Sequence, residues 1–557
     1  MAGPPQLLTD PLLQCPSERS VRVVWFTAFR GSAHAVWSGP GLAARTEATT
    51  TQLSRTREDA DSWQPGGVAA LERAPQERPI WRHEAEVRDL TPGERVPYCV
   101  ASWDEAGAVA RSATFELAPK PPAGQRLQIL LTSDHQLKPM TAANLQQVGA
   151  VADRVDGIFF AGDLTDIPDR ASDWFDDARG GAFFPCLQGN ARVALERGGR
   201  TATYRGAPLL QSAPLFAAIG NHEVMGRFSR EQPLEDQMDA AIPRSAAERL
   251  DGPAPASARE REAWFRDHAF NAQTYREILT LPQRPSGDSS YYAVTLGDIR
   301  LVVLYATCVW RTPSLDPDAC SKYRERDADL PHPHNWGYGQ HIFEPIHRGS
   351  AQYRWLAAEL AGEAFQQAPY RIVMLHHPPH SLGANVVPAY TDPVQSIERD
   401  SAGRISAVRY EYPQERDYLA RDVVPLLEAA GTQLVFYGHS HLWNRFVSAS
   451  GTHYLESSNV GNSYGAYWRA QRRPVPANHR ETYTERGDPY GLEPVVPNIA
   501  PLYGENGQPL PYIASNALTA FSLLDTGRGT VSSYRFDTRT PEAAAIKFDE
   551  FALQNSA

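Results

Sequence analysis

The sequence predicts an α/β protein that carries an all-β domain in front of it. Residues 21–118 contain short strand-like segments separated by turn residues, which is the pattern of a β-sandwich. Beyond residue 126, apolar runs alternate with helical sequence, and each run ends in a polar cluster. Strands without polar alternation are typical of a sheet that is covered on both faces, so we expect an α/β region there.

The N-terminal region divides into three parts: an extension over 1–20, a sandwich over 21–118 and a linker over 119–126. Pro119, Pro121 and Pro122 stiffen the linker, which is why a domain boundary is placed there. The segments expected as strands of the sandwich are 20–29, 33–39, 84–90, 97–104 and 112–118.

Residues 127–557 form the second region. Apolar segments 127–134 and 156–163 flank a helix that we expect to begin near Thr141, a suitable N-cap, and to end near Val151. Further strands are expected at 215–221, 299–307, 370–377, 432–440 and within 513–537. Polar insertions separate them, and insertions this long are usually functional or mobile. They cover 176–212, 223–270, 311–350, 383–410 and 466–512.

Composition excludes several classes of protein. The net charge is -11 and no basic patch stands out, which disfavours nucleic acid as a partner. No apolar run approaches the roughly 20 residues that span a bilayer. The N-terminus lacks the features of a secretory signal, so the sequence as given favours the cytoplasm. The five cysteines lack zinc-site spacing, and we expect free thiols, with Cys308–Cys320 the one pairing considered.

Polar clusters follow five of the apolar strands. They are SDHQ (133–136), GDLTD (162–166), GNHE (220–223), HHPPH (376–380) and GHSH (438–441). Together they offer carboxylates, amides and imidazoles, which hard and borderline divalent metals prefer, and no thiolate. Each cluster alone is typical of a polar turn. Because all five stand in order at strand ends, where α/β sheets place their sites, they predict a metal centre.

The spacing within the clusters supports this prediction. Residues i and i+2 of an extended chain point to the same side, so Asp134 and Gln136 can reach one metal or two adjacent metals. The same holds for His439 and His441. A glycine precedes Asp163, Asn221 and His439, and we expect it to let the backbone turn sharply at the strand end.

In this order the clusters resemble the calcineurin-like metallophosphoesterase family over about residues 127–465. The segments SVRVVWFT and HEAEVRDLTPGERVPYCV are similar to the fibronectin-type III-like domain of purple acid phosphatases. The resemblance implies a four-layer α/β/β/α sandwich after the N-terminal domain. It also implies a phosphoric ester hydrolase that acts on a small phosphorylated substrate with two metal ions, Fe, Mn or Zn. Such enzymes are often exported, so a periplasmic or extracellular location is the alternative.

The resemblance also implies roles for individual residues. Asp163 would bridge the two metals, and a hydroxide between the metals would attack the phosphorus. The first metal would also bind Asp134, Gln136 and His441, and the second would bind Asn221, His376 and His439. His222 would act as the catalytic acid. The candidate substrate contacts are Asn221, His222, His377 and His380.

Two positions depart from the family pattern. Asp166 stands where purple acid phosphatases carry a metal-bound tyrosine, so we expect no charge-transfer colour. Gln136 replaces the commoner histidine, and its neutral amide is expected to hold the first metal more loosely or to favour a harder ion. The missing tyrosine favours diesters and the N-terminal domain favours monoesters, so the sequence leaves this choice open.

The sequence leaves two other functions as alternatives. Ser463 lies in GNSYG (461–465), which matches the G-x-S-x-G nucleophile pattern, so a serine esterase is one alternative. The other is a non-catalytic scaffold protein that binds metal, against which the intact His222 argues. The sequence predicts no oligomeric state.

Overall fold

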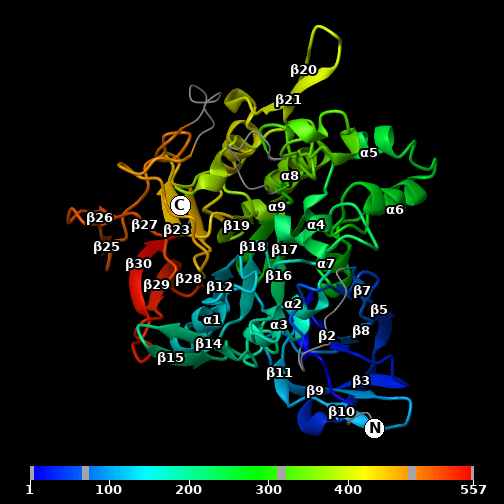
Figure 1. Cartoon of the computed structure of the whole chain (residues 1–557). Coiled ribbons are helices and arrows are strands. Elements are labelled where there is room, and N and C mark those ends of the chain that lie inside the picture. The colour runs from blue at the N-terminus through cyan, green and yellow to red at the C-terminus, as the bar shows by residue number, and fades with distance from the viewer. Residues whose placement is uncertain (1–4, 65–73, 310–321, 475–483, 554–557) are drawn as a thin grey trace.

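The computed structural model describes residues 5–64, 74–309, 322–474 and 484–553 (Figure 1). An all-β sandwich forms the N-terminal part. Its first sheet has the order β1 (Leu12–Gln14), β2 (Val21–Thr27), β8 (Trp81–Val87), β5 (Thr49–Gln52). Its second sheet has the order β10 (Val109–Arg111), β9 (Val96–Trp103), β3 (Ala33–Ser38), β4 (Ala44–Glu47), with β11 (Phe115–Leu117) on β9.

Strand β2 shows how the sandwich joins the rest of the molecule. Val23 and Trp25 point into the sandwich core, whereas Val24 and Phe26 belong to the large core of the catalytic region. This follows from the two-residue period of a strand. The ring of Phe26 lies 5.1 Å from that of Phe175. Strand β1 pairs with β2, so the sheet reaches into the expected N-terminal extension over 1–20.

Two mixed sheets build the catalytic region. The six-stranded sheet has the order β16 (Leu215–Ala217), β13 (Gly157–Phe160), β12 (Gln128–Thr132), β28 (Leu518–Asp525), β29 (Thr530–Asp537), β30 (Ile546–Ala552). The seven-stranded sheet has the order β17 (Tyr292–Leu296), β18 (Ile299–Val303), β19 (Tyr370–Met374), β22 (Leu434–Tyr437), β24 (His453–Ser457), β23 (Trp443–Val447), β27 (Tyr512–Ile513). Strands β12, β13 and β16 are parallel, as are β18, β19 and β22.

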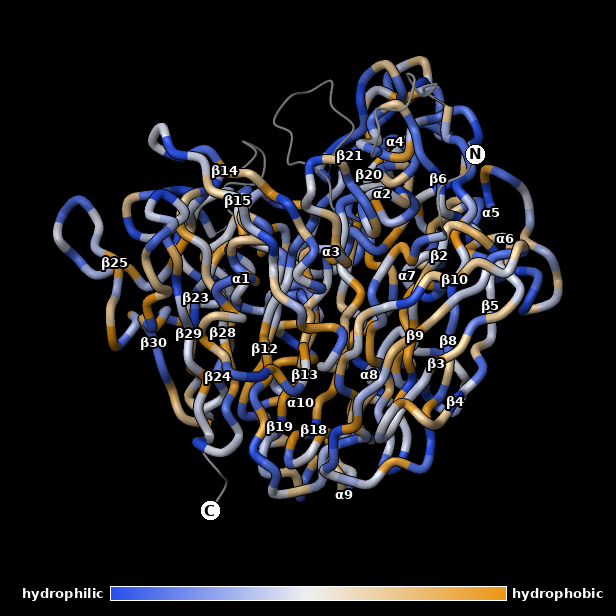
Figure 2. Tube along the Cα trace, turned by 90° about the horizontal axis from the view of Figure 1, so that it is seen from below, coloured by the Kyte–Doolittle hydropathy of each residue, from blue (hydrophilic) through white to orange (hydrophobic). Residues whose placement is uncertain are grey.

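These sheets form the inner layers of a four-layer sandwich. Leu301 and Val303 of β18 face the core shared with the six-stranded sheet. Val302, between them, packs in a second cluster with Leu356 of α8 (Ala351–Ala361). Leu145 of α1 (Thr141–Val151) belongs to the same large core, and α1 packs against β28 of the six-stranded sheet. Hydrophobic residues concentrate along β12, β13, β18 and β19 (Figure 2). The expected α/β/β/α architecture with an N-terminal β-sandwich is confirmed.

Helices cover the sheets and fill the insertions. They are α1 (Thr141–Val151), α2 (Ala171–Phe175), α3 (Phe183–Leu187), α4 (Leu234–Asp239), α5 (Arg244–Leu250), α6 (Ala258–His268), α7 (Gln273–Ile278), α8 (Ala351–Ala361), α9 (Glu363–Gln366) and α10 (Val424–Ala429). The insertions also carry hairpins: β14 (Val193–Arg197) with β15 (Arg200–Tyr204), β20 (Val394–Arg399) with β21 (Ile405–Glu411), and β25 (Leu502–Tyr503) with β26 (Pro509–Leu510). Parts of the insertions 311–350 and 466–512 lie outside the described residues.

The structure corrects two details of the sequence analysis. Helix α1 has the expected bounds, but its N-cap is Met140, and the hydroxyl of Thr141 donates a hydrogen bond to the carbonyl of His135. Strands β23, β24 and β30 were not expected, because each mixes polar or charged residues with apolar ones. The described cysteines, Cys15, Cys99, Cys186 and Cys308, are free thiols, and Cys320 lies outside the described residues.

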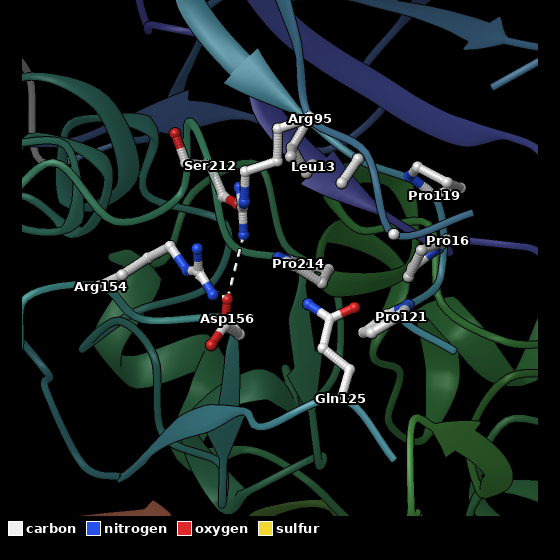
Figure 3. Close-up of a pocket in the computed structure, with 12 residues that line it drawn as sticks. Leu13, Pro16, Arg95, Pro119, Pro121, Gln125, Arg154, Asp156, Ser212 and Pro214 are labelled. Atoms are coloured by element: carbon white, nitrogen blue, oxygen red, sulfur yellow. Dashed lines mark hydrogen bonds and ion pairs between the residues drawn. The ribbon is translucent and has the colours of Figure 1, made fainter. Parts of the chain in front are cut away.

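The expected linker packs against the catalytic region. Pro119 and Pro121 line a small pocket where the two parts meet (Figure 3). On the opposite wall, Arg95 lies 3.1 Å from the carboxylate of Asp156, and it also donates to the carbonyl of Ser212. The two parts are therefore joined by packing and ion pairing as well as by the chain. Within the described residues, no helix is long and apolar enough to cross a membrane.

Candidate metal centre

Strand ends from both sheets bring the predicted ligands together where the two sheets meet. Asp134 follows β12 and Asp163 follows β13 in the six-stranded sheet, whereas His376 follows β19 and His439 follows β22 in the other. The two sheets meet here. The ring of His376 lies 2.8 Å from the carbonyl of Ala161, and the amide of His439 donates to the carboxylate of Asp134.

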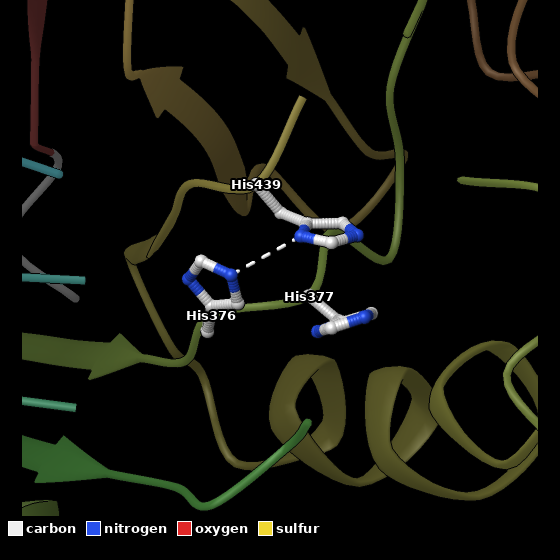
Figure 4. Close-up of side chains that lie close together, drawn as sticks. All are labelled: His376, His377 and His439. Atoms are coloured by element: carbon white, nitrogen blue, oxygen red, sulfur yellow. Dashed lines mark hydrogen bonds between the residues drawn. The ribbon is translucent and has the colours of Figure 1, made fainter. Parts of the chain in front are cut away.

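One group of side chains surrounds His376, and Figure 4 shows His439 of this group beside it, with His377 nearby. Nε2 of His376 lies 3.1 Å from Nδ1 of His439, 3.0 Å from Oδ1 of Asn221 and 3.3 Å from Oδ2 of Asp163. All four are buried. Metal–ligand bonds of about 2.0–2.2 Å leave neighbouring ligand atoms roughly 3 Å apart. The group therefore has the spacing of a coordination shell.

A second group shares the carboxylate of Asp163. Nε2 of Gln136 lies 3.2 Å from Oδ2 of Asp163, and Nε2 of His441 lies 3.4 Å from Oδ1 of Asp134. Ligand atoms of Asp134, Asp163 and His441 lie within 4.8 Å of one another. Asp163 Oδ2 thus stands between the two groups, as a bridging ligand must. The structure brings all seven predicted ligands together, while their binding of metal stays a prediction.

The electrostatic environment of His376 and an unpaired side-chain oxygen of Gln136 suit the binding of cations at this site. Burial lowers the pKa of His376, but the carboxylates of Asp163 and Asp134 more than offset this and raise its pKa to about 9. A positive charge is thus favoured at this point. The side-chain oxygen of Gln136 is buried and finds no hydrogen-bond partner within the described residues. An unpaired buried amide oxygen is costly unless it binds a ligand, so the donor set suits a metal.

Backbone conformation at the ligands is unusual. Five of the seven predicted ligands have a positive φ: Asp134 (58°), Gln136 (40°), Asp163 (60°), His439 (81°) and His441 (55°). Such conformations cost about 1–3 kcal/mol each in ordinary residues and persist where the surrounding structure enforces them, often at functional sites. Holding these side chains in place therefore lowers the stability of the fold.

The glycines before the ligands act differently from the expectation. Gly162 has a φ of 94° and does make a sharp turn, but Gly220 and Gly438 do not have a positive φ. They are needed because a Cβ atom at Gly220 would lie 2.1 Å from the carboxylate of Asp163, and one at Gly438 would lie 2.2 Å from that of Asp134. These two positions require glycine because the backbone passes close to the carboxylate of a predicted ligand, and not because the chain turns sharply there.

His222 lies at the rim of the same site. Its amide donates to Oδ1 of Asp163 at 2.9 Å. Its Nδ1 lies 2.6 Å from the carbonyl oxygen of Asp166, so this nitrogen carries a proton and donates it to the carbonyl. The side chain is 15% exposed. Nε2 is therefore the atom of His222 that is available to a substrate.

Two buried glutamates hold the ligand loops, and sequence reasoning gave neither a role. The carboxylate of Glu223 accepts hydrogen bonds from the amides of Asp163, Leu164 and Gly220. Glu456 accepts from the amide of Ser440. Burial raises the pKa of Glu456 to about 8. No sequence signal marked Glu456, because β24 has the mixed sequence HYLES and does not read as a buried strand.

His377 and His380 have partners inside the protein. Nε2 of His377 lies 3.1 Å from the thiol of Cys308, and its ring stacks on His439 at 3.8 Å. Nδ1 of His380 lies 3.1 Å from the carboxylate of Asp488. Both are buried. His377 thus supports a predicted ligand from behind, and a substrate contact by either residue stays a prediction.

The GNSYG loop serves the same site in another way. Among the described residues, β24 ends at Ser457 and the next strand begins at Leu502, so the strand-to-helix turn of a nucleophile elbow is missing. Instead the carbonyl of Asn462 lies 2.9 Å from Nδ1 of His441, and the ring of Tyr464 stacks on that imidazole. The loop orients a predicted metal ligand, and its geometry does not favour Ser463 as a nucleophile.

The N-terminal domain clamps the loop that carries Asp166. The short strand β6 (Arg57–Glu58), paired with β7 (Gln76–Glu77), contacts this loop, which covers residues 165–177 and includes the short helix α2. Arg57 lies 2.9 Å from the carboxylate of Asp169, and Glu58 accepts hydrogen bonds from the amide and hydroxyl of Ser172. Because the carbonyl of Asp166 holds His222, the sandwich reaches the site through this clamp.

Asp173 in the clamped loop predicts a pH effect on stability. Burial raises its pKa to about 8, although the cation of Arg170 opposes this. In the unfolded chain the carboxyl of Asp173 has a pKa of about 3.9, so it loses its proton at a lower pH than in the folded protein. Ionisation therefore favours unfolding as the pH rises from about 4 to 8, by up to about 1.4 kcal/mol per pH unit. Asp173→Asn keeps the acceptor for the amide of Ile167 and cannot ionise. Its melting temperature should fall less than that of the wild type between pH 5 and pH 8. Equal slopes would show that Asp173 ionises freely when folded.

Comparison with known proteins decides the family. The calcineurin-like phosphoesterase family matches residues 127–442, which is more than half of the chain. The chain belongs to the calcineurin-like phosphoesterase family. Membership assigns this calcineurin-like phosphoesterase to the phosphoric ester hydrolases, and it implies a dinuclear metal site. The candidate centre contains groups of His and Asp side chains that could hold metal ions. No curated protein matches the sequence.

A solved structure shares the fold of this phosphoesterase. The purple acid phosphatase PPD1 from yellow lupin (Lupinus luteus) seeds superposes with a TM-score of 0.55 at 13% identity, covering 97% of this chain and 73% of that chain. Because the match spans nearly the whole chain, it includes the N-terminal sandwich. GAP50 of Plasmodium gives a TM-score of 0.31 at 11% identity, covering 77% of this chain and 90% of that chain.

Proposed function

We propose that this protein hydrolyses small phosphoesters with two metal ions held by the seven predicted ligands, and with His222 as the catalytic acid. The position of Asp163 carries the proposal, because its Oδ2 accepts a hydrogen bond from the amide nitrogen of Gln136 at 3.2 Å and lies 3.3 Å from Nε2 of His376, so it contacts one member of each ligand group. Two ions at such a site would polarise the phosphoryl group and activate water.

The chain's own residues then provide positioning and a proton. His222 keeps its Nδ1 proton on the carbonyl of Asp166 and presents Nε2 at the rim of the site. In its protonated form, Nε2 can donate to the leaving oxygen of the ester, which is general acid catalysis. The hydrogen bond from its backbone amide to Asp163 fixes this ring beside the bridging carboxylate. Asn221, adjacent in the chain, is the ligand on the other side of the same turn.

The metal dependence is tested by removal and restoration of metal. The protein is treated with chelator, dialysed, and supplied with Mn, Zn or Fe, and each form is assayed with an aryl phosphate monoester and its bis-aryl diester. We expect turnover to disappear on chelation and to return with metal, and we expect two metals per chain by elemental analysis. Full turnover after complete metal removal would refute the proposal.

His222→Ala should separate chemistry from metal binding. The variant keeps all seven ligands, so we expect two metals per chain and a rate loss of about 100-fold to 10,000-fold, the usual contribution of general acid catalysis. Asn221→Ala is the matched variant, since it should lose one metal and most turnover. A His222→Ala enzyme that works at the wild-type rate would remove His222 from the mechanism.

A further inference from the structure

Lys138 is a buried cation beside the metal centre to which no role has been given so far. It lies two residues after Gln136, in a turn closed by a hydrogen bond from its amide to the carbonyl of His135. Its side chain is buried, with 5% exposed. The carboxylates near enough to act on its ammonium group electrostatically are those of Asp134, Asp163, Asp166 and Glu456.

The ammonium group lacks a hydrogen-bond partner. It has three donors, and within the part of the chain that the structure describes, Nζ is buried without any acceptor in hydrogen-bonding distance. A buried charge that is not hydrogen-bonded is costly, so such a lysine is rarely kept for packing. The donors of Lys138 are thus left for a group that the protein itself does not supply.

Neutralising Asp134 does not account for this lysine. Both carboxylate oxygens of Asp134 accept the amide of His439, at 3.1 and 3.0 Å, and Oδ1 also faces Nε2 of His441. Lys138 adds its charge to a site that is expected to hold two cations already. A further cation weakens metal binding but strengthens the binding of an anion, because charge-assisted hydrogen bonds are about twice as strong as neutral ones.

We propose that the ammonium group of Lys138 binds a phosphoryl oxygen of the substrate and makes the site selective for phosphate monoesters. A monoester dianion carries one more negative charge than a diester monoanion, so a fixed cation in contact with the phosphoryl group favours the monoester. This inference rests on the proposed function, and it decides between the two ester classes that the sequence left open.

Three variants test the proposal by activity. Lys138→Met removes the charge and keeps the length, Lys138→Arg keeps the charge, and Lys120→Met makes the same change at a partly exposed lysine of the linker. In Lys138→Met, kcat/KM for an aryl phosphate monoester should fall about 10-fold to 100-fold, the range of one hydrogen bond to a charged group. The value for the bis-aryl diester should fall by a smaller factor, since that anion carries one negative charge fewer. Lys138→Arg should recover much of the loss, and Lys120→Met should match the wild type.

Binding of inorganic phosphate provides a readout that does not depend on turnover. Calorimetric titration of the metal-loaded proteins should show phosphate binding about tenfold weaker or more in Lys138→Met, with two metals per chain retained. Equal losses for both esters, loss of metal, or unchanged phosphate affinity would overturn the assignment. If the wild type turned over neither ester, the proposed function would fail, yet the phosphate titration would still decide whether Lys138 binds the anion.

Discussion

Asp163→Asn is expected to reduce metal-dependent hydrolysis by about a thousandfold or more. Metal ions contribute several kcal/mol to transition-state stabilisation, and each 1.4 kcal/mol is a factor of ten in rate. Asparagine fits the same space, but only the carboxylate of Asp134 would then remain among the seven ligands to balance two cations. The variant also weakens the acceptor for the amide of His222. Elemental analysis and initial rates should show metal loss and activity loss together.

Asp153→Asn is the matched control for this change. Asp153 is exposed in the connection between α1 and β13, so its replacement should leave both metal content and rate unchanged. Because the two variants have the same change in charge, a general electrostatic effect would appear in both. An Asp163→Asn protein that retained two metals and more than a tenth of the wild-type rate would show that Asp163 is not the bridging ligand.

Arg57→Ala should cause the largest loss of stability among the changes considered. Arg57 and Asp169 are buried, with 4% and 1% of their surfaces exposed, and their side chains lie 2.9 Å apart. Removing one partner leaves an unpaired buried charge, which costs about 3–5 kcal/mol. Denaturant unfolding should show this loss. Activity should fall as well, because the clamped loop carries the carbonyl that holds His222.

Arg55→Ala provides the comparison for Arg57→Ala. Arg55 pairs with Asp267, whose side chain is 47% exposed, and pairs with a solvent-exposed partner contribute about 0–1 kcal/mol. The double replacement of Arg57 and Asp169 by alanine should recover part of the stability, since no lone charge then remains buried. If Arg57→Ala were as stable as Arg55→Ala, the clamp would not contribute to the fold.

The sequence was sufficient for the parallel strands of both sheets and for the polar clusters at their ends, because apolar runs and polar clusters are local patterns. Thus β12 and β13 could be placed, and Asp134 and Asp163 with them. The supporting contacts were not local. Glu456 reaches Ser440 from another strand, and Arg57 reaches Asp169 from another domain. Nothing in the neighbouring sequence of these residues specifies such partners.

Conformational details of the site were also beyond the sequence. The positive φ values of Asp134 and His439 arise where two sheets meet, since each loop has to fit against the other. Local preference alone would place such residues in ordinary turns. The close approach at Gly438 has the same origin, because the carboxylate it faces belongs to the other sheet. Patterns in one sequence indicate which residues come together in the site, but not the backbone conformations and close contacts with which they pack.

The pairing of β12 with β28 has a consequence for how the protein is made. Leu130 lies opposite Leu523, so the strand that leads to Asp134 gains its neighbour on this side only after most of the chain has left the ribosome. Until then one edge of β12 is open to pairing with other strands. Contacts this distant slow folding and prolong the exposure of apolar edges. We therefore expect nascent chains that are stalled before β28 to need chaperone protection and to lack a complete metal centre.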